Sequence, residues 1–204
     1  MIDVFYSIDV SVFHFINDTI SNAVFDVVMP FLTDLNKMLF GRVLAAALWI
    51  LLLVKGTKKE RIVAVILIPL VVLTDQLSST VIKNLVLRPR PCHEIGGIPV
   101  VANIRLLVDC GSGFSFPSSH AVNNIGAATY FSYFYRKWTW AFFTFGGLVA
   151  ISRVYVGVHY PSDTIGGAII GAACAALVIV LWKWLAKTFD LLNYPGSGIL
   201  QSDA

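Results

Sequence analysis

Five stretches of this chain are apolar enough, and long enough, to form membrane-spanning helices. The clearest, residues 164–182, runs for 19 residues without a charged side chain, and a helix of about 20 residues crosses a hydrocarbon core of roughly 30 Å. The other four are interrupted more often by polar residues and cover residues 38–54, 62–87, 121–135 and 138–151. The pattern predicts an all-α protein, a polytopic membrane helix bundle.

The first 36 residues differ from these spans because their polar and apolar positions follow a helical period. Apolar side chains recur at intervals near 3.6 residues, opposite a polar face that includes Asp18 and Asp26. The pattern predicts one or two amphipathic helices in residues 1–36, lying at the outer interface or packed on the bundle. A sixth transmembrane helix over residues 20–35 is the alternative. It would turn Asp26 toward protein, because a carboxylate facing lipid is costly.

Composition supports the membrane assignment. Hydrophobic residues make up 57% of the 204 residues and charged residues only 13%, whereas soluble domains are about half apolar. The net charge of +3 is too small to indicate a nucleic-acid partner. We expect one domain over residues 1–189, followed by a disordered tail, 190–204. Gly167 and Gly171 form a small-residue face that favours close packing within the bundle over dimerisation, so we expect a monomer or a weak oligomer.

Basic residues indicate how the bundle is oriented in the membrane. Three clusters of lysine and arginine follow the first, third and fifth predicted spans. In a five-span chain these clusters share one side, which the positive-inside rule makes cytoplasmic. The loops 88–120 and 153–163 then share the opposite, outer side. The clusters are Lys55, Lys58, Lys59 and Arg61, then Arg136 and Lys137, then Lys183 and Lys187.

The segment "KNLVLRPRP" places cations on that outer side. Lys83 lies about one turn before the end of its span, with Arg88 and Arg90 just beyond. Such side chains commonly anchor a helix by extending to the interface. They are scarce on outer faces, however, and together with Arg105 and Arg153 they suit an anion such as phosphate. This segment alone supports anchoring and anion binding equally.

The segment "FPSSHA" has the composition of a helix start. Pro117, Ser118 and Ser119 precede an apolar run, with a serine near the capping position. Unpaired backbone N–H groups and the positive end of the helix dipole make such a start a site for anions. His120 falls in the first turn, and considered alone it is also typical of a single interfacial histidine.

The segment "SRVYVGVHYPSD" joins the last two predicted spans. Pro161 and Asp163 suit the first turn of a helix, and His159 precedes that helix by about two residues. A carboxylate four residues along can accept a hydrogen bond from one imidazole nitrogen, which directs the other outward as a nucleophile or base. An interfacial histidine followed by an acidic first turn explains the segment equally well when it is taken alone.

Together the three segments resemble the signature of the type 2 phosphatidic acid phosphatase superfamily. The resemblance spans residues 83–163, with spacing intact in the first and third motifs. One departure is Ser119, where the family usually has glycine. Serine is expected to be tolerated if the backbone there does not require a positive φ. The matching pattern is Lys83-x6-Arg90-Pro91, then Pro117-Ser118-Ser119-His120, then Ser152-Arg153-x5-His159-x3-Asp163.

The resemblance implies a role for each motif residue. His159 would attack phosphorus to form a phosphohistidine, while Asp163 orients it. His120 would protonate the leaving oxygen and then activate the water that hydrolyses the intermediate. No metal or other cofactor is implied. The phosphoryl oxygens would be held by nearby backbone amides and by Lys83, Arg90, Ser118, Ser119 and Arg153.

The implied function is that of a metal-independent membrane lipid phosphatase. Its partner would be a phosphorylated lipid in the bilayer: undecaprenyl diphosphate, phosphatidylglycerol phosphate, phosphatidic acid or a lipid A phosphate. We expect the bacterial inner (cytoplasmic) membrane, with the active site facing the periplasm or the extracytoplasmic side. The alternative is a non-catalytic membrane protein that binds or transports phosphorylated lipids.

Four outer residues lie outside the motifs. Cys92 and Cys110 share the long outer loop and either form a disulfide, if that side is oxidising, or remain reduced thiols. Arg88 and Arg105 are expected to guide a lipid head group or to bind anionic lipid.

Overall fold

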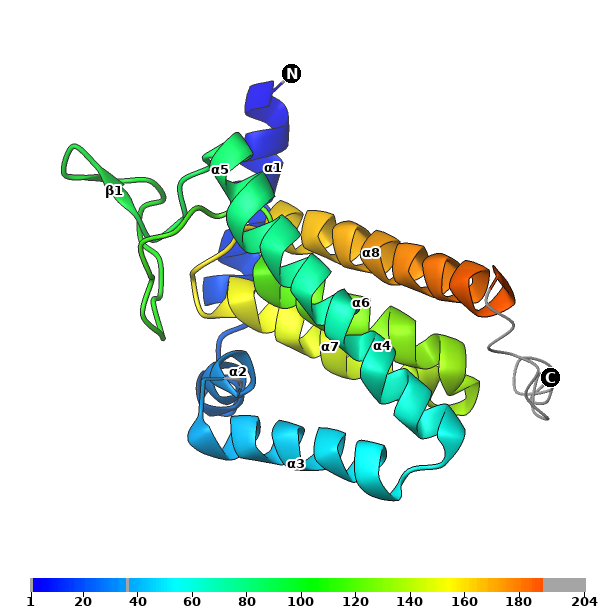
Figure 1. Ribbon diagram of the computed structural model, residues 1–204. Helices are drawn as coiled ribbons and strands as arrows, with labels where there is room; N and C mark the ends of the chain where they lie inside the picture. Colours follow the sequence, from blue (N-terminus) through cyan, green and yellow to red (C-terminus); the bar gives the residue numbers. More distant parts are fainter. Residues whose placement is uncertain (1, 36, 189–204) are drawn as a thin grey trace.

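The computed structural model describes residues 2–35 and 37–188, and the tail predicted for residues 190–204 lies outside them. The described chain is mostly helical, with one short hairpin (Figure 1). The predicted helical class is therefore correct, and each predicted span coincides with helix.

The last three long helices form the centre of the bundle. Helix α6 (Ser119–Phe134) is joined through a 3₁₀ turn, η3 (Arg136–Trp138), to α7 (Thr139–Tyr155), and α8 (Pro161–Thr188) packs along α6. The small residues of α8 allow this contact, because a Cβ at Gly167 would lie 2.8 Å from the Ser118 carbonyl oxygen. The small-residue face thus packs the bundle closely, as predicted.

A continuous helical rod covers another face of this centre. It comprises α4 (Lys58–Asp75), a π-helical segment η2 (Gln76–Ile82) and α5 (Lys83–Val86). A capping box between Thr57 and Glu60 starts the rod. The buried Tyr130 hydroxyl of α6 donates to the Val63 carbonyl at 2.8 Å, which fastens α6 to α4. Helix α3 (Leu39–Lys55) lies against α4, where the indole of Trp49 donates to the Ala64 carbonyl at 2.9 Å.

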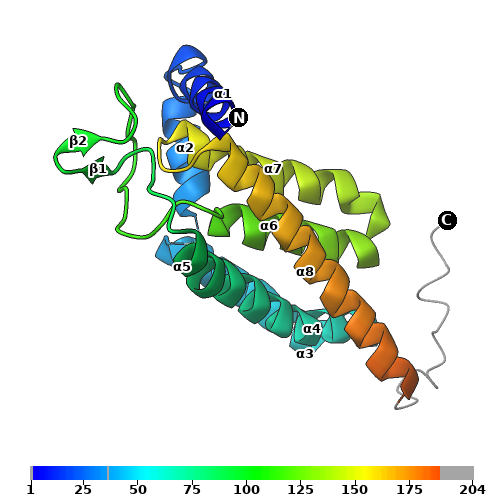
Figure 2. The ribbon, with the colours of Figure 1, turned by 90° about the horizontal axis from the view of Figure 1, so that it is seen from above.

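The N-terminal segment consists of three short helical pieces: α1 (Ile2–His14), a π-helical turn η1 (Phe15–Thr19) and α2 (Phe25–Asp34). They gather at the end of the bundle where α7 ends and α8 begins (Figure 2). Asp9 and Asp26 both face protein partners. The sequence predicted that these helices lie either at the membrane interface or packed on the bundle, and α1 packs on the bundle against α8.

The bundle carries lipid-facing apolar surface. Side chains such as Leu39, Val65 and Ile169 are more than half exposed, which suits a hydrocarbon solvent. Among the residues that the structure describes, two helices, the 58–86 rod and α8, are long and apolar enough to cross a membrane, and α2 together with α3 would add a third. These helices agree with an integral membrane protein, while the count of five or six spans stays a prediction.

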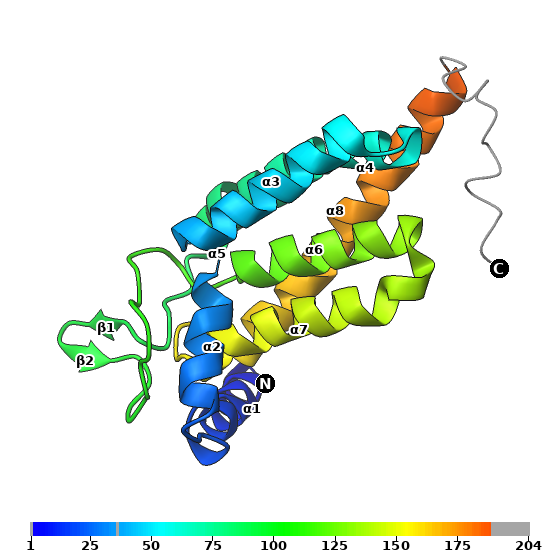
Figure 3. The same ribbon diagram turned by 90° about the horizontal axis from the view of Figure 1, so that it is seen from below.

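The two ends of the bundle differ in character. The α3–α4 turn, the α6–α7 turn and the last turns of α8 lie at one end, and these carry the three basic clusters (Figure 3). At that end Lys59 lies 5.2 Å from the centre of the Tyr135 ring. The 87–118 loop lies at the other end. It holds a hairpin of β1 (Glu94–Ile95) and β2 (Ile98–Pro99), and a disulfide joins Cys92 to Cys110.

Candidate functional site

The motif residues converge at the end of the bundle opposite the basic clusters. They come from four places: α5, the loop that follows it, the start of α6, and the junction between α7 and α8. Two helix starts occur where the sequence predicted them, with His120 in the first turn of α6 and Pro161 opening α8. Arg153 was predicted to lie in the loop after its span. It lies instead in the last turn of α7, because this helix extends to Tyr155.

His159 and Asp163 form a buried pair. The imidazole Nδ1 lies 3.4 Å from Asp163 Oδ2, and both side chains are almost fully buried. The short α7–α8 connection brings the two side chains together. It turns at Gly157, whose φ of +90° would be strained for any residue with a side chain. Burial lowers the pKa of His159 to about 4, although its bond with Asp163 opposes the change. At neutral pH the imidazole is therefore uncharged, with Nε2 available to react.

Asp163 is held by more than the histidine. Its Oδ2 accepts hydrogen bonds from the Ser115 hydroxyl at 2.5 Å and from the Tyr160 backbone N–H at 2.9 Å. Its Oδ1 accepts from Arg88 at 2.7 Å. The Ser115 hydroxyl also lies 3.5 Å from His159 Nδ1. Sequence reasoning missed Ser115, because it stands two residues before the middle motif without any spacing signal.

The start of α6 presents polar atoms that have no partner in the described part of the chain. Ser118 takes the capping position, but its hydroxyl does not cap the helix. Ser119 is helical and not at a positive φ, so the condition for replacing glycine is met. Leaving a buried polar atom unpaired costs about 1–3 kcal/mol, so this grouping favours a polar ligand. The unpaired atoms include Ser118 Oγ, Ser119 Oγ, His120 Nε2 and Arg153 Nε.

Three cations at this end of the bundle have no carboxylate partner among the described residues. Arg90 donates to the carbonyls of Gly113 at 2.7 Å and Cys110 at 2.5 Å. Arg153 donates to the Thr33 hydroxyl at 2.6 Å. Lys83 interacts electrostatically with Arg90 and Arg153. Within residues 2–35 and 37–188 none of the three cations forms an ion pair, so the site is positive and suited to an anion.

The other two arginines near this end of the bundle, Arg88 and Arg105, form ion pairs within the protein. Arg88 pairs with Asp9 and Asp163, each at 2.7 Å. Arg105 pairs with Asp26 at 2.6 Å. Both guanidinium groups are thus paired with carboxylates of the protein, and the expectation that they guide a lipid head group or bind anionic lipid stays a prediction. As for metals, the described residues contain no group of three or more His, Cys, Asp or Glu side chains arranged to hold an ion.

Comparison with known proteins identifies the family. The family model described as the PAP2 superfamily matches residues 63–187. A lipid A 4′-phosphatase of Bacteroides thetaiotaomicron is 31% identical over 97% of this chain and 88% of its own length. A lipid A 4′-phosphatase of Porphyromonas gingivalis is 33% identical over 70% of this chain and 63% of its own length.

Solved structures show the same fold. The PAP2-type phosphatidylglycerolphosphate phosphatase of Bacillus subtilis matches with a TM-score of 0.66 at 24% identity, over 95% of this chain and 89% of that one. The family model covers more than half of the chain and all three motifs. The chain therefore belongs to the PAP2 superfamily, and it is a membrane phosphatase of that family.

Proposed function

We propose that this protein removes phosphate from a membrane lipid through a phosphohistidine on His159, at the outer face of a bacterial inner membrane. The observation that carries the proposal is an uncharged, carboxylate-held imidazole beside three unpaired cations. A protein that only bound or transported phosphorylated lipids would need the cations but not an oriented nucleophile. The geometry therefore favours turnover over the non-catalytic alternative.

The proposed reaction has two steps. The Nε2 atom of His159 attacks phosphorus, the bond to the lipid oxygen breaks, and His120 gives that oxygen a proton. Water then attacks the phosphohistidine, His120 removes a proton from it, and the phosphorus–nitrogen bond breaks to release inorganic phosphate. Throughout, the phosphoryl charge would be held by Lys83, Arg90, Arg153, Ser118 and Ser119.

A lipid A phosphate is our first choice of substrate class. Both relatives described above carry the name lipid A 4′-phosphatase, and one of them aligns over nearly the whole chain. The other candidates remain undecaprenyl diphosphate, phosphatidylglycerol phosphate and phosphatidic acid. In each case the apolar chains would stay in the bilayer beside the exposed apolar helix faces, while the phosphate enters between helix ends.

The decisive experiment measures phosphate release from these four lipids in detergent micelles, with EDTA present throughout. We expect release without added metal, fastest with the lipid A phosphate. His159→Ala should abolish both release and the covalent phosphate label, with an unchanged melting temperature as the control for folding. Near-normal release by His159→Ala would refute the nucleophile. Saturable lipid binding by the wild type without any release would favour the non-catalytic alternative.

Sidedness needs a separate test. The hairpin residue Ile98 is 72% exposed at the site end of the bundle, so a cysteine there should react with a membrane-impermeant maleimide in spheroplasts. A cysteine at exposed Trp184, near the opposite end, should react only after lysis. The reverse pattern would place the site in the cytoplasm.

A further inference from the structure

Arg88 links two acidic side chains from distant parts of the chain. One guanidinium nitrogen donates to Asp163 Oδ1 and the other to Asp9 Oδ2, each at 2.7 Å. The guanidinium carbon also lies 3.9 Å from the centre of the Tyr160 ring. Burial disfavours the charge, but the two carboxylates outweigh it and raise the pKa of Arg88. Arg88 is therefore a fixed cation that joins α1 to the first turn of α8.

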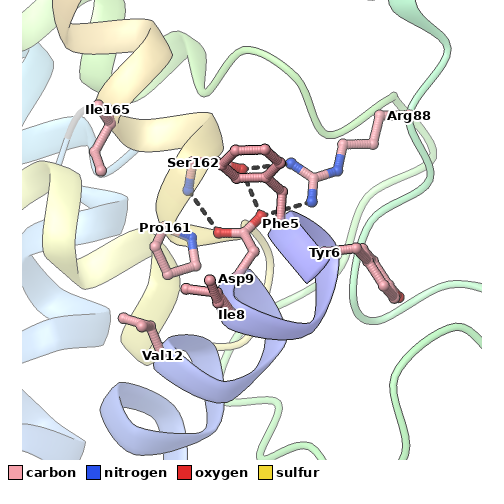
Figure 4. A pocket seen from close by; sticks show the side chains of 9 residues that line it. All are labelled: Phe5, Tyr6, Ile8, Asp9, Val12, Arg88, Pro161, Ser162 and Ile165. Carbon is pink, nitrogen blue, oxygen red and sulfur yellow. Dashed lines mark hydrogen bonds and ion pairs between the residues drawn. The ribbon is translucent and has the colours of Figure 1, made fainter. Parts of the chain in front are cut away.

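Asp9 holds the start of α8 directly as well. Its Oδ1 accepts from the Ser162 backbone N–H at 2.9 Å, and its Oδ2 accepts from the Ser162 hydroxyl at 2.5 Å. Figure 4 shows these bonds, with Asp9 projecting from α1 between Ser162 and Arg88. A carboxylate that accepts from the first-turn N–H groups stabilises a helix N-terminus. Here that carboxylate comes from another helix, and the turn it caps contains Asp163.

Arg88 also supports the second partner of Asp163 through its backbone. Its carbonyl accepts from the Ser115 N–H at 2.7 Å, and the Ser115 hydroxyl donates to Asp163 Oδ2. The chain can turn back to make this contact because Leu87 adopts a left-handed conformation with φ 54°. Both oxygens of Asp163 thus depend on Arg88, one through the guanidinium group and one through Ser115.

We propose that Asp9 and Arg88 are positioning residues, through which α1 fixes the carboxylate that orients His159. The proposal rests on the proposed function, since it assumes His159 as the nucleophile. With Oδ1 bound to Arg88, the carboxylate cannot rotate and Oδ2 remains directed at the imidazole. Loss of that restraint would let the nucleophile drift, and a misplacement of about 1 Å can reduce a rate about 100-fold.

A purely structural role for the same ion pair is the competing explanation, and the fold contains its own control. A second ion pair, Arg105–Asp26, also ties the N-terminal segment to the bundle, at 2.6 Å. Asp26 also accepts a hydrogen bond from the Tyr155 hydroxyl, and within the described residues neither Asp26 nor Arg105 bonds to Asp163 or His159. Breaking this second pair loosens the N-terminal segment without releasing Asp163.

The test compares Asp9→Asn, Arg88→Gln and Arg88→Lys with the control Asp26→Asn. The readouts are kcat, KM and the rate at which phosphate label appears on His159 in rapid-quench experiments. We expect Arg88→Gln to lower kcat and the labelling rate about 100-fold with little change in KM. Arg88→Lys should recover part of that loss, because a lysine restores charge but not the two-pronged contact. The kcat and labelling rate of Asp9→Asn should fall about 10-fold, and those of Asp26→Asn should remain within about twofold of the wild-type values.

Equal losses in Asp9→Asn and Asp26→Asn would overturn the proposal, because docking of the N-terminal segment would then explain both. Wild-type labelling rates in Arg88→Gln would also overturn it. If Arg88→Gln fails to fold, the difference in kcat and labelling rate between Asp9→Asn and Asp26→Asn still distinguishes a positioning role from a purely structural one. Activity that survives in His159→Ala would instead refute the proposed function, which keeps the two failures distinguishable.

Discussion

The contact between α6 and α8 at Gly171 sets the distance between the two halves of the site. A Cβ on Gly171 would lie 2.2 Å from the Val122 carbonyl oxygen and 2.9 Å from the Gly126 nitrogen. Both atoms belong to the backbone of α6 and cannot swing away as a side chain would. Since an unstrained contact requires about 3.5 Å, Gly171→Ala must separate the helices by roughly 1 Å.

That separation should impair both stability and catalysis. Overpacking of a close contact costs about 1–3 kcal/mol, which should lower the melting temperature by several degrees for a chain of this size. Helix α6 carries His120 in its first turn and α8 carries Asp163 in its own. A displacement of roughly 1 Å between them should lower kcat by up to about 100-fold.

Gly147→Ala is the matched control, because a Cβ at Gly147 on α7 would meet nothing within 4 Å. Both variants add one methyl group to a glycine in a bundle helix. The assay is a melting curve in detergent together with phosphate release from the preferred lipid. We expect Gly147→Ala to behave as the wild type. The reasoning is refuted if Gly171→Ala matches Gly147→Ala in both melting temperature and kcat.

Two further predictions concern the 87–118 loop and the effect of pH. The Cys92–Cys110 disulfide should stabilise the fold by about 3 kcal/mol on the chain-entropy model. Replacing both cysteines by serine should also raise KM, because the Cys110 carbonyl helps to hold Arg90 in place. An unchanged KM and melting temperature in that variant would contradict this. Burial lowers the pKa of His159 from 6.5 to about 4, so the folded protein binds a proton at His159 less readily than the unfolded chain does. The free energy of unfolding should therefore be fully retained above pH 6.5 and fall by about 3 kcal/mol as the pH drops toward 4. Melting curves should show this slope in the wild type and a weaker one in His159→Gln, and equal slopes would argue against it.

The helices and the motifs were predictable because their signals are local. A long apolar run or a proline and serine before such a run marks a helix by itself. Starts of helices were therefore found at Ser118–Ser119 and at Pro161. The end of α7 was placed four residues too early, at Ile151 instead of Tyr155. The polar residues Ser152 and Arg153 end the apolar run, but their burial against protein keeps the helix intact.

The side chains that support the site were not predictable, because their contacts join distant parts of the chain. Asp9 meets Arg88 across 79 positions, and Arg88 meets Asp163 across 75. Ser115 reaches Asp163 across 48. No periodicity or spacing marks such pairs in a single sequence. In the sequence Asp9 is one of several aspartates among the first 36 residues, and no pattern distinguishes it.

The five cations near the site show why these long-range contacts matter for function. The sequence places Lys83, Arg88, Arg90, Arg105 and Arg153 in the same region, and the motif pattern assigns only Lys83, Arg90 and Arg153 to the phosphate.

The ion pairs of the structure divide these five cations in the same way as the motifs do. Asp9 and Asp163 neutralise Arg88, and Asp26 neutralises Arg105. Arg90 and Arg153 keep neutral partners, and Lys83 forms no ion pair within the described residues, so these charges are left for a ligand. Two of these three carboxylates come from the N-terminal segment. That segment, although it carries no motif, therefore neutralises two arginines beside the candidate site, and its removal should release Arg105 and leave Arg88 paired with Asp163 alone.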